Sequence, residues 1–259
     1  METMKPDPRT PFDSVPEAFD RWRPRYCDEL FDRVAARAAL GPGKRSLEIG
    51  PGTGQATEFA LRTGADCTAV ELGANLAAVC ERKFARYPNF RLVRGDFAAI
   101  PFEPASFDLV YSAATIQWIP EEIAFPKTFD LLKPGGTLAM MLTKGDYRTP
   151  NEALYQRIQE VYARYFHPET EYAHGSFAYT NATIYGYVDF EKREYQGERV
   201  FTADEYISFC GTHCDHIVIP EPDKSKFFSG LREAVLEAGN RIVFQDTYTL
   251  YLTKKPMNN

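Results

Sequence analysis

A short glycine-rich segment after a strand-like run constrains the fold of this 259-residue chain more than any other feature. The segment reads Ser46-Leu-Glu-Ile-Gly-Pro-Gly-Thr-Gly-Gln55, a pattern typical of a buried strand that turns into a helix near Gln55. Gly50, Gly52 and Gly54 permit positive φ angles and lack the Cβ atoms that would keep a ligand away from the backbone. The first N–H groups of the helix have no intrahelical partners. The segment therefore predicts a turn that binds a nucleotide-like cofactor.

Two residues of this segment indicate which cofactor the turn suits. The dinucleotide fingerprint G-x-G-x-x-G has a third glycine, which lets helix and strand pack closely around a pyrophosphate. Here Gln55 stands at that third position, and Glu48 places a carboxylate at the end of the strand. Because like charges repel, we expect this carboxylate to disfavour a pyrophosphate and to suit a cofactor with an amino group.

Two further strand-like runs end in acidic residues. Thr68-Ala-Val-Glu71 ends about twenty residues after the glycines, at the spacing from which an acid binds both hydroxyls of a ribose. Leu72 follows this acid, and we expect it to line the same site. A third run, from Phe90, ends in Asp96 and Phe97, which we expect to hydrogen-bond an adenine edge and to pack on the adenine face.

In this order, the motifs resemble those of the class I S-adenosylmethionine-dependent methyltransferases. The resemblance runs through residues 15–145 and includes a closing strand near 241–253; it is strongest for a small-molecule branch similar to trans-aconitate methyltransferases. Phe107-Asp-Leu-Val-Tyr-Ser-Ala is similar to the family's fourth strand, and Leu131-Leu-Lys-Pro-Gly-Gly-Thr-Leu to the turn into its fifth. The resemblance implies S-adenosyl-L-methionine as the cofactor. It also implies an α/β fold with a doubly wound, Rossmann-like seven-stranded sheet and a mostly helical lid insertion.

The resemblance assigns cofactor contacts outside the glycine-rich turn as well. Phe19-Asp-Arg-Trp-Arg-Pro-Arg-Tyr-Cys27 is similar to a Tyr-x-x-x-Arg-Pro-x-Tyr-Pro opening, so Arg23 is expected to hold the cofactor carboxylate with two hydrogen bonds. Phe19 and Cys27 depart from that opening. Ser112 and Trp118 lie in a segment similar to the family's Gln-Trp or His-Trp segment, and are expected at the cofactor. A place in the pocket floor and an ordinary core position both fit Trp118.

Three histidines are the candidate catalytic residues. Thr212-His-Cys-Asp-His216 resembles a Thr-Tyr-Ser-x-His element of the family, in which His216 takes the place of the histidine and His213 that of the tyrosine. A histidine with a pKa near neutrality can remove a proton from an attacking hydroxyl or carboxylic acid. His174, between aromatic residues, is a further candidate. The alternative is a structural histidine bound to the backbone at a helix end.

Composition narrows the range of partners and compartments. The net charge of −6 and the pI near 5.4 disfavour a nucleic-acid backbone as the main partner. The N-terminal segment has no apolar run like that of a signal peptide, and no run is long enough to span a membrane, so we expect a cytoplasmic protein. Cys210 and Cys214 flank His213 without the spacing of a zinc ribbon, and no metal site is predicted.

The pattern of periodicity divides the chain into a core and an insertion. We expect residues 1–148, 188–201 and 240–259 to form the cofactor-binding core. Residues 149–187 and 202–239 are then a lid over the carboxyl ends of the strands, where open α/β sheets bind their ligands.

The expected elements follow the same division. Strands are expected near 45–49, 67–71, 90–94, 107–112, 136–143, 188–201 and 241–252, and helices near 26–40, 55–63, 74–86, 151–166, 203–212 and 222–238. A further helix over 120–132 contains Pro126, so we expect it to kink or to start late. Residues 1–16 are expected to be a loose arm.

Methyl transfer to a small molecule, most simply O-methylation of a carboxylate or hydroxyl, is the function that these observations favour. A base is optional in such a reaction, because a substrate carboxylate needs none. Ser112-Ala-Ala-Thr stands where amino-methylating enzymes of DNA and protein glutamine have Asp/Asn-Pro-Pro-Tyr. Two alternatives stay open: a catalytically silent protein that binds the same cofactor, and, less favoured, an NAD(P)-dependent oxidoreductase. The oligomeric state is open.

Overall fold

The computed structural model describes residue 7 and residues 9–168 and 177–257. Contacts between residues divide the chain into two compact units. Unit 1 consists of the described residues within 1–23, 144–173 and 196–247, and unit 2 of those within 24–143, 174–195 and 248–259.

These boundaries differ from the expected division into core and lid within 1–23, 144–148, 174–187, 196–201 and 240–247, and packing explains two of these differences. The segment before Arg23 groups with unit 1 because α1 (Pro16–Trp22) packs on α7 (Ala203–Cys210), and the rings of Trp22 and Phe201 lie 6.5 Å apart. Residues 177–195 group with unit 2 because η4 (Tyr179–Tyr185) packs on α5 (Glu121–Leu131). The role of any segment as a lid stays a prediction.

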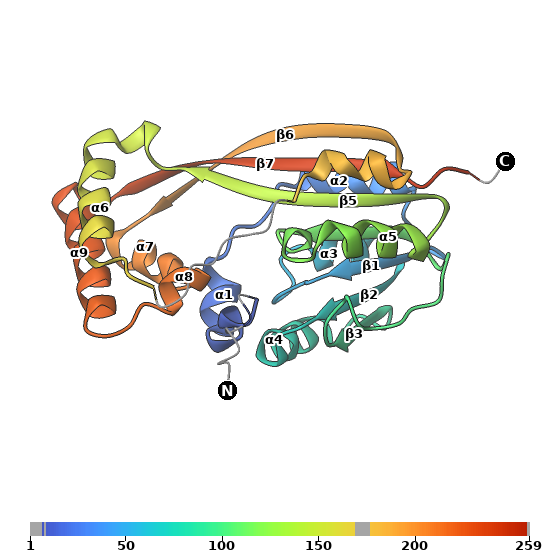
Figure 1. Cartoon of the computed structure of the whole chain (residues 1–259), viewed down its shortest axis with the longest axis horizontal. Coiled ribbons are helices and arrows are strands. Elements are labelled where there is room, and N and C mark those ends of the chain that lie inside the picture. The colour runs from blue at the N-terminus through green and yellow to red at the C-terminus, as the bar shows by residue number, and fades with distance from the viewer. Residues whose placement is uncertain (1–6, 8, 169–176, 258–259) are drawn as a thin grey trace. The chain divides into compact units, whose positions relative to one another are not determined.

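A seven-stranded sheet runs through the molecule, as expected, in the order β3-β2-β1-β4-β5-β7-β6 (Figure 1). The strands are β1 (Arg45–Ile49), β2 (Asp66–Glu71), β3 (Phe90–Arg94), β4 (Phe107–Ala113), β5 (Leu132–Asp146), β6 (Val188–Phe201) and β7 (Ile242–Lys254). β1 pairs in parallel with β2 and β4, β2 with β3, and β4 with β5. Ile49 lies opposite both Val70 and Ser112, so the carboxyl ends of β1, β2 and β4 meet at one edge.

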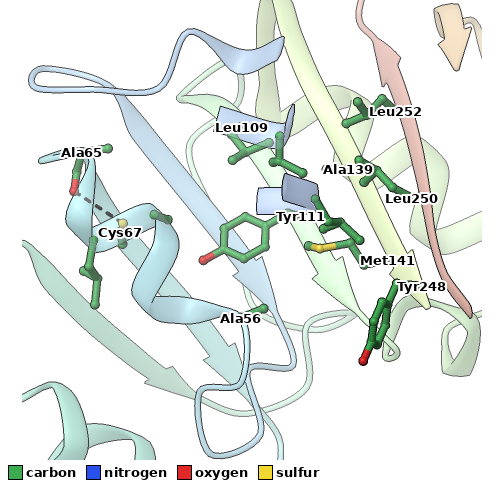
Figure 2. Packing of buried hydrophobic residues seen from close by; sticks show 14 of the residues in the cluster. Ala56, Ala65, Cys67, Leu109, Tyr111, Ala139, Met141, Tyr248, Leu250 and Leu252 are labelled. Carbon is green, nitrogen blue, oxygen red and sulfur yellow. Dashed lines mark hydrogen bonds between the residues drawn. The ribbon is translucent and has the colours of Figure 1, made fainter. Parts of the chain in front are cut away.

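In unit 2, two hydrophobic clusters hold helices to the sheet. One contains side chains of α2 (Asp28–Ala38), α3 (Thr57–Arg62) and α4 (Ala74–Phe84) together with strand residues. Figure 2 shows Tyr111 and Leu109 of β4 in this cluster beside Met141 of β5 and Leu250 of β7. The other contains α5 and η4 side chains with the remaining strand residues, including Leu47. The doubly wound arrangement predicted from the sequence is therefore confirmed.

Several expected elements differ in length from those observed. α5 begins at Glu121 and includes Pro126, so the expected late start is wrong. β5 starts at Leu132, before the expected 136, and pairs with Phe107 at its first residue. Residues 11–14, expected in a loose arm, form the 3-10 helix η1 (Pro11–Ser14). Sequence periodicity also missed the one-turn helix α8 (Cys214–Ile217), which is too short to show a period.

Unit 1 has its own hydrophobic core. η3 (Thr149–Asn151), α6 (Glu152–Tyr165), α7 and α9 (Asp223–Glu237) surround the ends of β6 and β7, and α9 packs on both α6 and α7. Asp246 is fully buried there and forms an ion pair with Arg199, whose guanidinium also lies over the Phe209 ring. No helix in the described ranges is long and apolar enough to cross a membrane.

Candidate functional site

The glycine-rich turn that follows β1 has the backbone that the sequence predicts. Gly50, Gly52 and Gly54 have φ angles of +65°, +59° and +91°. A Cβ on Gly50 would lie 2.3 Å from Cγ2 of Thr115, and one on Gly54 would lie 2.2 Å from Cε2 of Phe84. At these two positions the glycines are therefore required by the protein's own packing as well as by φ.

Glu71, the predicted ribose-binding acid, accepts hydrogen bonds from two turns at the carboxyl edge of the sheet. Its Oε2 accepts a hydrogen bond from the backbone N–H of Gly52 at 2.8 Å, and its Oε1 accepts one from the N–H of Gly73 at 2.8 Å. The side chain is 6% exposed. A carboxylate accepts about four hydrogen bonds, so these two do not by themselves prevent it from binding ribose hydroxyls. Glu71 therefore supports the turn in addition to its predicted role.

Glu48 lies beneath the turn, 1% exposed. Its Oε2 accepts hydrogen bonds from the hydroxyls of Thr57, at 2.6 Å, and Tyr111, at 3.0 Å, while its Oε1 has no hydrogen-bond partner among the described residues. Burial raises the pKa of Glu48 to about 7, in spite of the two hydrogen bonds, and the charge of Glu71 acts in the same direction. A buried acceptor without a donor suits an amino group, as the sequence predicts.

Further contacts fix the turn, and the sequence analysis missed two of the residues that make them. The Thr115 hydroxyl donates to the carbonyl oxygen of Gly50 at 3.1 Å, and Lys83 Nζ donates to that of Thr53 at 3.1 Å. Gln55, predicted at the cofactor, donates to the Thr53 hydroxyl at 2.7 Å. Helix α3 begins at Thr57, two residues after the expected start. No sequence signal marks Thr115 or Lys83, because each reaches the turn from another element.

Two predicted cofactor residues have mainly structural positions. Ser112 is fully buried; its hydroxyl donates to the carbonyl oxygen of Ile49 at 3.2 Å and accepts from the N–H of Ile116 at 2.9 Å. It therefore supports the strand ends, and its contact with a cofactor stays a prediction. Phe97 is 4% exposed within the core, with Lys127 Nζ 5.0 Å from its ring centroid. Most of its surface is covered by the core, and its contact with an adenine face stays a prediction.

The remaining predicted residues of unit 2 lie near the surface. Asp96 accepts a hydrogen bond from the N–H of Ala98 at 2.9 Å and is partly exposed. Leu72 and Trp118 are half-buried, and Trp118 lies in the 3-10 helix η2 (Ile116–Trp118) after β4. These three residues stay predicted cofactor contacts.

The predicted histidines of unit 1 form a cluster with an acid and a tyrosine. His216 is 5% exposed; its Nε2 lies 2.7 Å from the Tyr162 hydroxyl, and its Nδ1 lies 3.0 Å from Asp215 Oδ1. The sequence analysis did not identify Tyr162 as a site residue, because its spacing in α6 indicates only that it lies on one face of a helix. In spite of its short distance to Asp215, Nδ1 of His216 makes no hydrogen bond to any described residue, so only the contact between the imidazole and the Tyr162 hydroxyl can pass a proton.

His213 is poorly suited to act as a base. Its Nδ1 lies 3.1 Å from the carbonyl oxygen of Cys210, which can only accept, so the proton resides on Nδ1. Burial, with the nearby charges of Arg23 and His216, lowers its pKa. A base works best when its pKa lies near the working pH, so the predicted catalytic role of His213 is not supported.

Two further predicted site residues are Arg23 and His174. Arg23 follows α1 in unit 1, with its guanidinium over the rings of Phe12 and Phe19, and its contact with a cofactor carboxylate stays a prediction. His174 lies outside the described residues. Among the described residues, no three His, Cys, Asp or Glu side chains are grouped to hold a metal ion.

Comparison with known proteins agrees with this geometry. Residues 47–140 match the family described as the methyltransferase domain. Over 144 residues, the chain is 31% identical to the malonyl-[acyl-carrier protein] O-methyltransferase of Enterobacter lignolyticus, which covers 51% of this chain and 55% of that relative. Over 79 residues, it is 40% identical to ribosomal RNA small subunit methyltransferase A of a Synechococcus strain, covering 29% and 28%. The chain therefore spans less than two thirds of the length of these relatives.

A solved structure shows the same fold. A Haemonchus contortus phosphoethanolamine N-methyltransferase 2, in complex with S-adenosylhomocysteine, superposes with a TM-score of 0.57 at 18% identity. The match covers 95% of this chain and 58% of that one. The sheet is therefore that of the class I methyltransferase fold.

Proposed function

We propose that this protein, whose residues 47–140 form a class I methyltransferase domain, binds S-adenosyl-L-methionine and transfers its methyl group to a small-molecule acceptor. The observation that carries the proposal is the position of Glu71, fixed by the N–H groups of Gly52 and Gly73 at the carboxyl edge of the sheet. An acid at the end of the second strand, beside a glycine-rich turn, is the arrangement that binds ribose hydroxyls in this class of fold.

Other residues fit the rest of the cofactor. The unpartnered Oε1 of Glu48 suits the cofactor's amino group, Asp96 is the candidate for the adenine edge, and Arg23 is the candidate for the carboxylate. When bound, S-adenosyl-L-methionine supplies a methyl group already activated by a sulfonium. The protein then contributes binding, alignment and exclusion of water rather than covalent chemistry.

We further propose O-methylation of a carboxylate or hydroxyl. In the cluster around His216, the imidazole does not reach solvent, and the Tyr162 hydroxyl is the group through which it would accept a proton. A carboxylate acceptor needs no such base, and the O-methyltransferase activity named for the Enterobacter relative is consistent with that class. The five free cysteines suit a reducing compartment, in which we place this activity.

Calorimetric titration tests the cofactor. We expect S-adenosylmethionine and S-adenosylhomocysteine to bind, and NAD and NADP not to bind. Glu71→Gln should weaken S-adenosylmethionine binding by about 1.5–3 kcal/mol, because a charged acceptor is lost. The control is Glu81→Gln, which removes an exposed acid paired with Arg94. Binding of NAD alone, or of none of the four, would contradict the proposal.

An acceptor screen tests the reaction. Formation of S-adenosylhomocysteine would be followed with carboxylic acids, phenols, amines and a ribosomal RNA fragment, the last because one relative is named for RNA methylation. Turnover with a small acid or phenol supports the proposal, whereas turnover with RNA alone contradicts it. Cofactor binding without turnover on any acceptor favours the silent binding protein.

A further inference from the structure

A pocket lies in unit 2 at the amino edge of the sheet, where the strands of the core begin. Lys44 precedes β1, Asp108 is the second residue of β4, and Lys133 is the second residue of β5. These residues, with Arg37 at the end of α2 and Lys254 at the end of β7, line a pocket of about 460 Å³ that is open to solvent. The glycine-rich turn follows the opposite, carboxyl end of β1, so the pocket is separate from the proposed cofactor site.

The lining of this pocket carries an excess of positive charge. Four of its side chains are cationic, and Asp108 is the one carboxylate among its lining residues, which leaves a formal charge of 4 − 1 = +3. Asp108 Oδ1 lies 3.1 Å from Lys44 Nζ, and its Oδ2 lies 2.7 Å from Lys133 Nζ. Burial alone would raise the pKa of Asp108, but the hydrogen bonds that it accepts outweigh burial and lower this pKa. One ionised carboxylate therefore positions two ammonium groups and neutralises only one.

The two other cations have unused capacity for an anion. Arg37 Nη2 donates to the carbonyl oxygen of Asp189 at 3.1 Å and lies 3.7 Å from the exposed carboxylate of the same residue, but the Nε of Arg37 is buried without a hydrogen-bond partner among the described residues. Lys254 forms no ion pair with any residue in the described part of the chain. A buried N–H without an acceptor is costly, and a guanidinium pairs readily with phosphate oxygens.

We propose that this pocket binds the phosphate group or groups of a small molecule. Its volume lies within the range of small-ligand sites, and its cations converge on one concave place. A nucleic acid requires an extended basic surface, whereas the whole chain has a net charge of −6. The proposal does not depend on the proposed methyl transfer, because none of the predicted cofactor residues lines this pocket.

Calorimetric titration of the full chain with pyrophosphate at low ionic strength tests this inference. We expect one binding site and an affinity that falls as sodium chloride is added. Lys254→Gln should weaken binding about tenfold, because one charge-assisted hydrogen bond is lost. Arg37→Gln should weaken it at least as much. Lys226→Gln is the matched control, since it removes the same charge from an exposed position that does not line the pocket.

The variants also distinguish a loss of anion binding from a loss of folding stability. Lys254 has no ion-pair partner in the described part of the chain, so Lys254→Gln should keep the melting temperature even if Arg37→Gln lowers it. Titration with glycerol 3-phosphate distinguishes a phosphorylated metabolite from inorganic pyrophosphate as the source of the phosphate. The inference is overturned if neither anion binds, or if Lys254→Gln and Lys226→Gln bind alike. Binding of single-stranded RNA that pyrophosphate does not displace would also overturn it.

Discussion

The glycine-rich turn of unit 2 and the histidine cluster of unit 1 are built in different ways. The turn has three left-handed glycines within five residues, and Glu71 binds it through backbone N–H groups. The histidine cluster joins Tyr162 of α6 to His216 of α8, 54 residues apart, through side chains alone. One region is thus specified by a local motif, and the other by packing between distant segments.

This difference predicts which kind of substitution destabilises each unit most. In unit 2, the side chains of Thr115 and Phe84 occupy the space that a Cβ on Gly50 or Gly54 would need. In unit 1, buried polar side chains depend on single partners, as Asp246 does on Arg199. We therefore expect unit 2 to be most sensitive to added atoms and unit 1 to removed partners.

The largest expected effect is that of Asp246→Asn in unit 1. The carboxylate is fully buried, and removing its charge leaves the Arg199 guanidinium without its counter-ion. Such losses cost about 3–5 kcal/mol of unfolding free energy, which urea denaturation would measure. The control is Asp204→Asn, which breaks an exposed pair with Arg232 and should change little. If the two variants were equally stable, unit 1 would not depend on this pair.

Gly54→Ala should have the next largest effect. The new Cβ would require an unfavourable left-handed φ and would overlap Phe84, which together cost about 3–4 kcal/mol of unfolding free energy. Gly43→Ala is a matched control, since Gly43 has a φ of +77° and open space around its Cβ position. Urea denaturation of both variants would show whether the overlap adds to the cost of φ. Equal destabilisation would mean that Phe84 simply moves away.

Glu48→Gln should change how the free energy of unfolding depends on pH. The folded-state pKa of about 7 exceeds the ordinary value of 4.5, so this group's contribution to stability is complete below pH 4.5 and lost as pH rises through 7. Relative to the variant, the wild type should lose about 2–3 kcal/mol of unfolding free energy over that interval.

Chemical denaturation from pH 2 to 8 would measure this difference. Glu191→Gln provides a control of opposite sign, because a hydrogen bond from Arg33 lowers the pKa of Glu191 to about 2. The stability due to Glu191 is therefore present above pH 4.5 and lost as pH falls through 2. A pH-independent difference between Glu48→Gln and the wild type would show that folding does not raise the pKa of Glu48 above its ordinary value.

Tyr162→Phe should have the smallest effect on stability. It removes one hydrogen bond to His216 Nε2, which costs about 1 kcal/mol. If the cluster passes a proton during methyl transfer, turnover should fall much more than stability, and its pH profile should change. Tyr165→Phe, about one helical turn further along α6, is the control. Equal turnover of both variants would make the cluster purely structural.

The sequence by itself determined the sheet, its glycine-rich turn and most helices. These follow from local signals: apolar runs for the strands, glycines for positive φ, and helical periodicity for α2, α6 and α9. Glu48 and Glu71 were identified because their spacing from the glycines fixes their place at aligned strand ends.

Only the tertiary structure decided which side chains meet. Ser112 and Phe97 lie in motifs that resemble cofactor contacts, yet the packing of β4 and α5 buries both. Thr115, Lys83 and Tyr162 carry no local signal, since each acts on a residue of another element. The physical reason is that backbone conformation depends on neighbours in sequence, whereas side-chain contacts depend on neighbours in space.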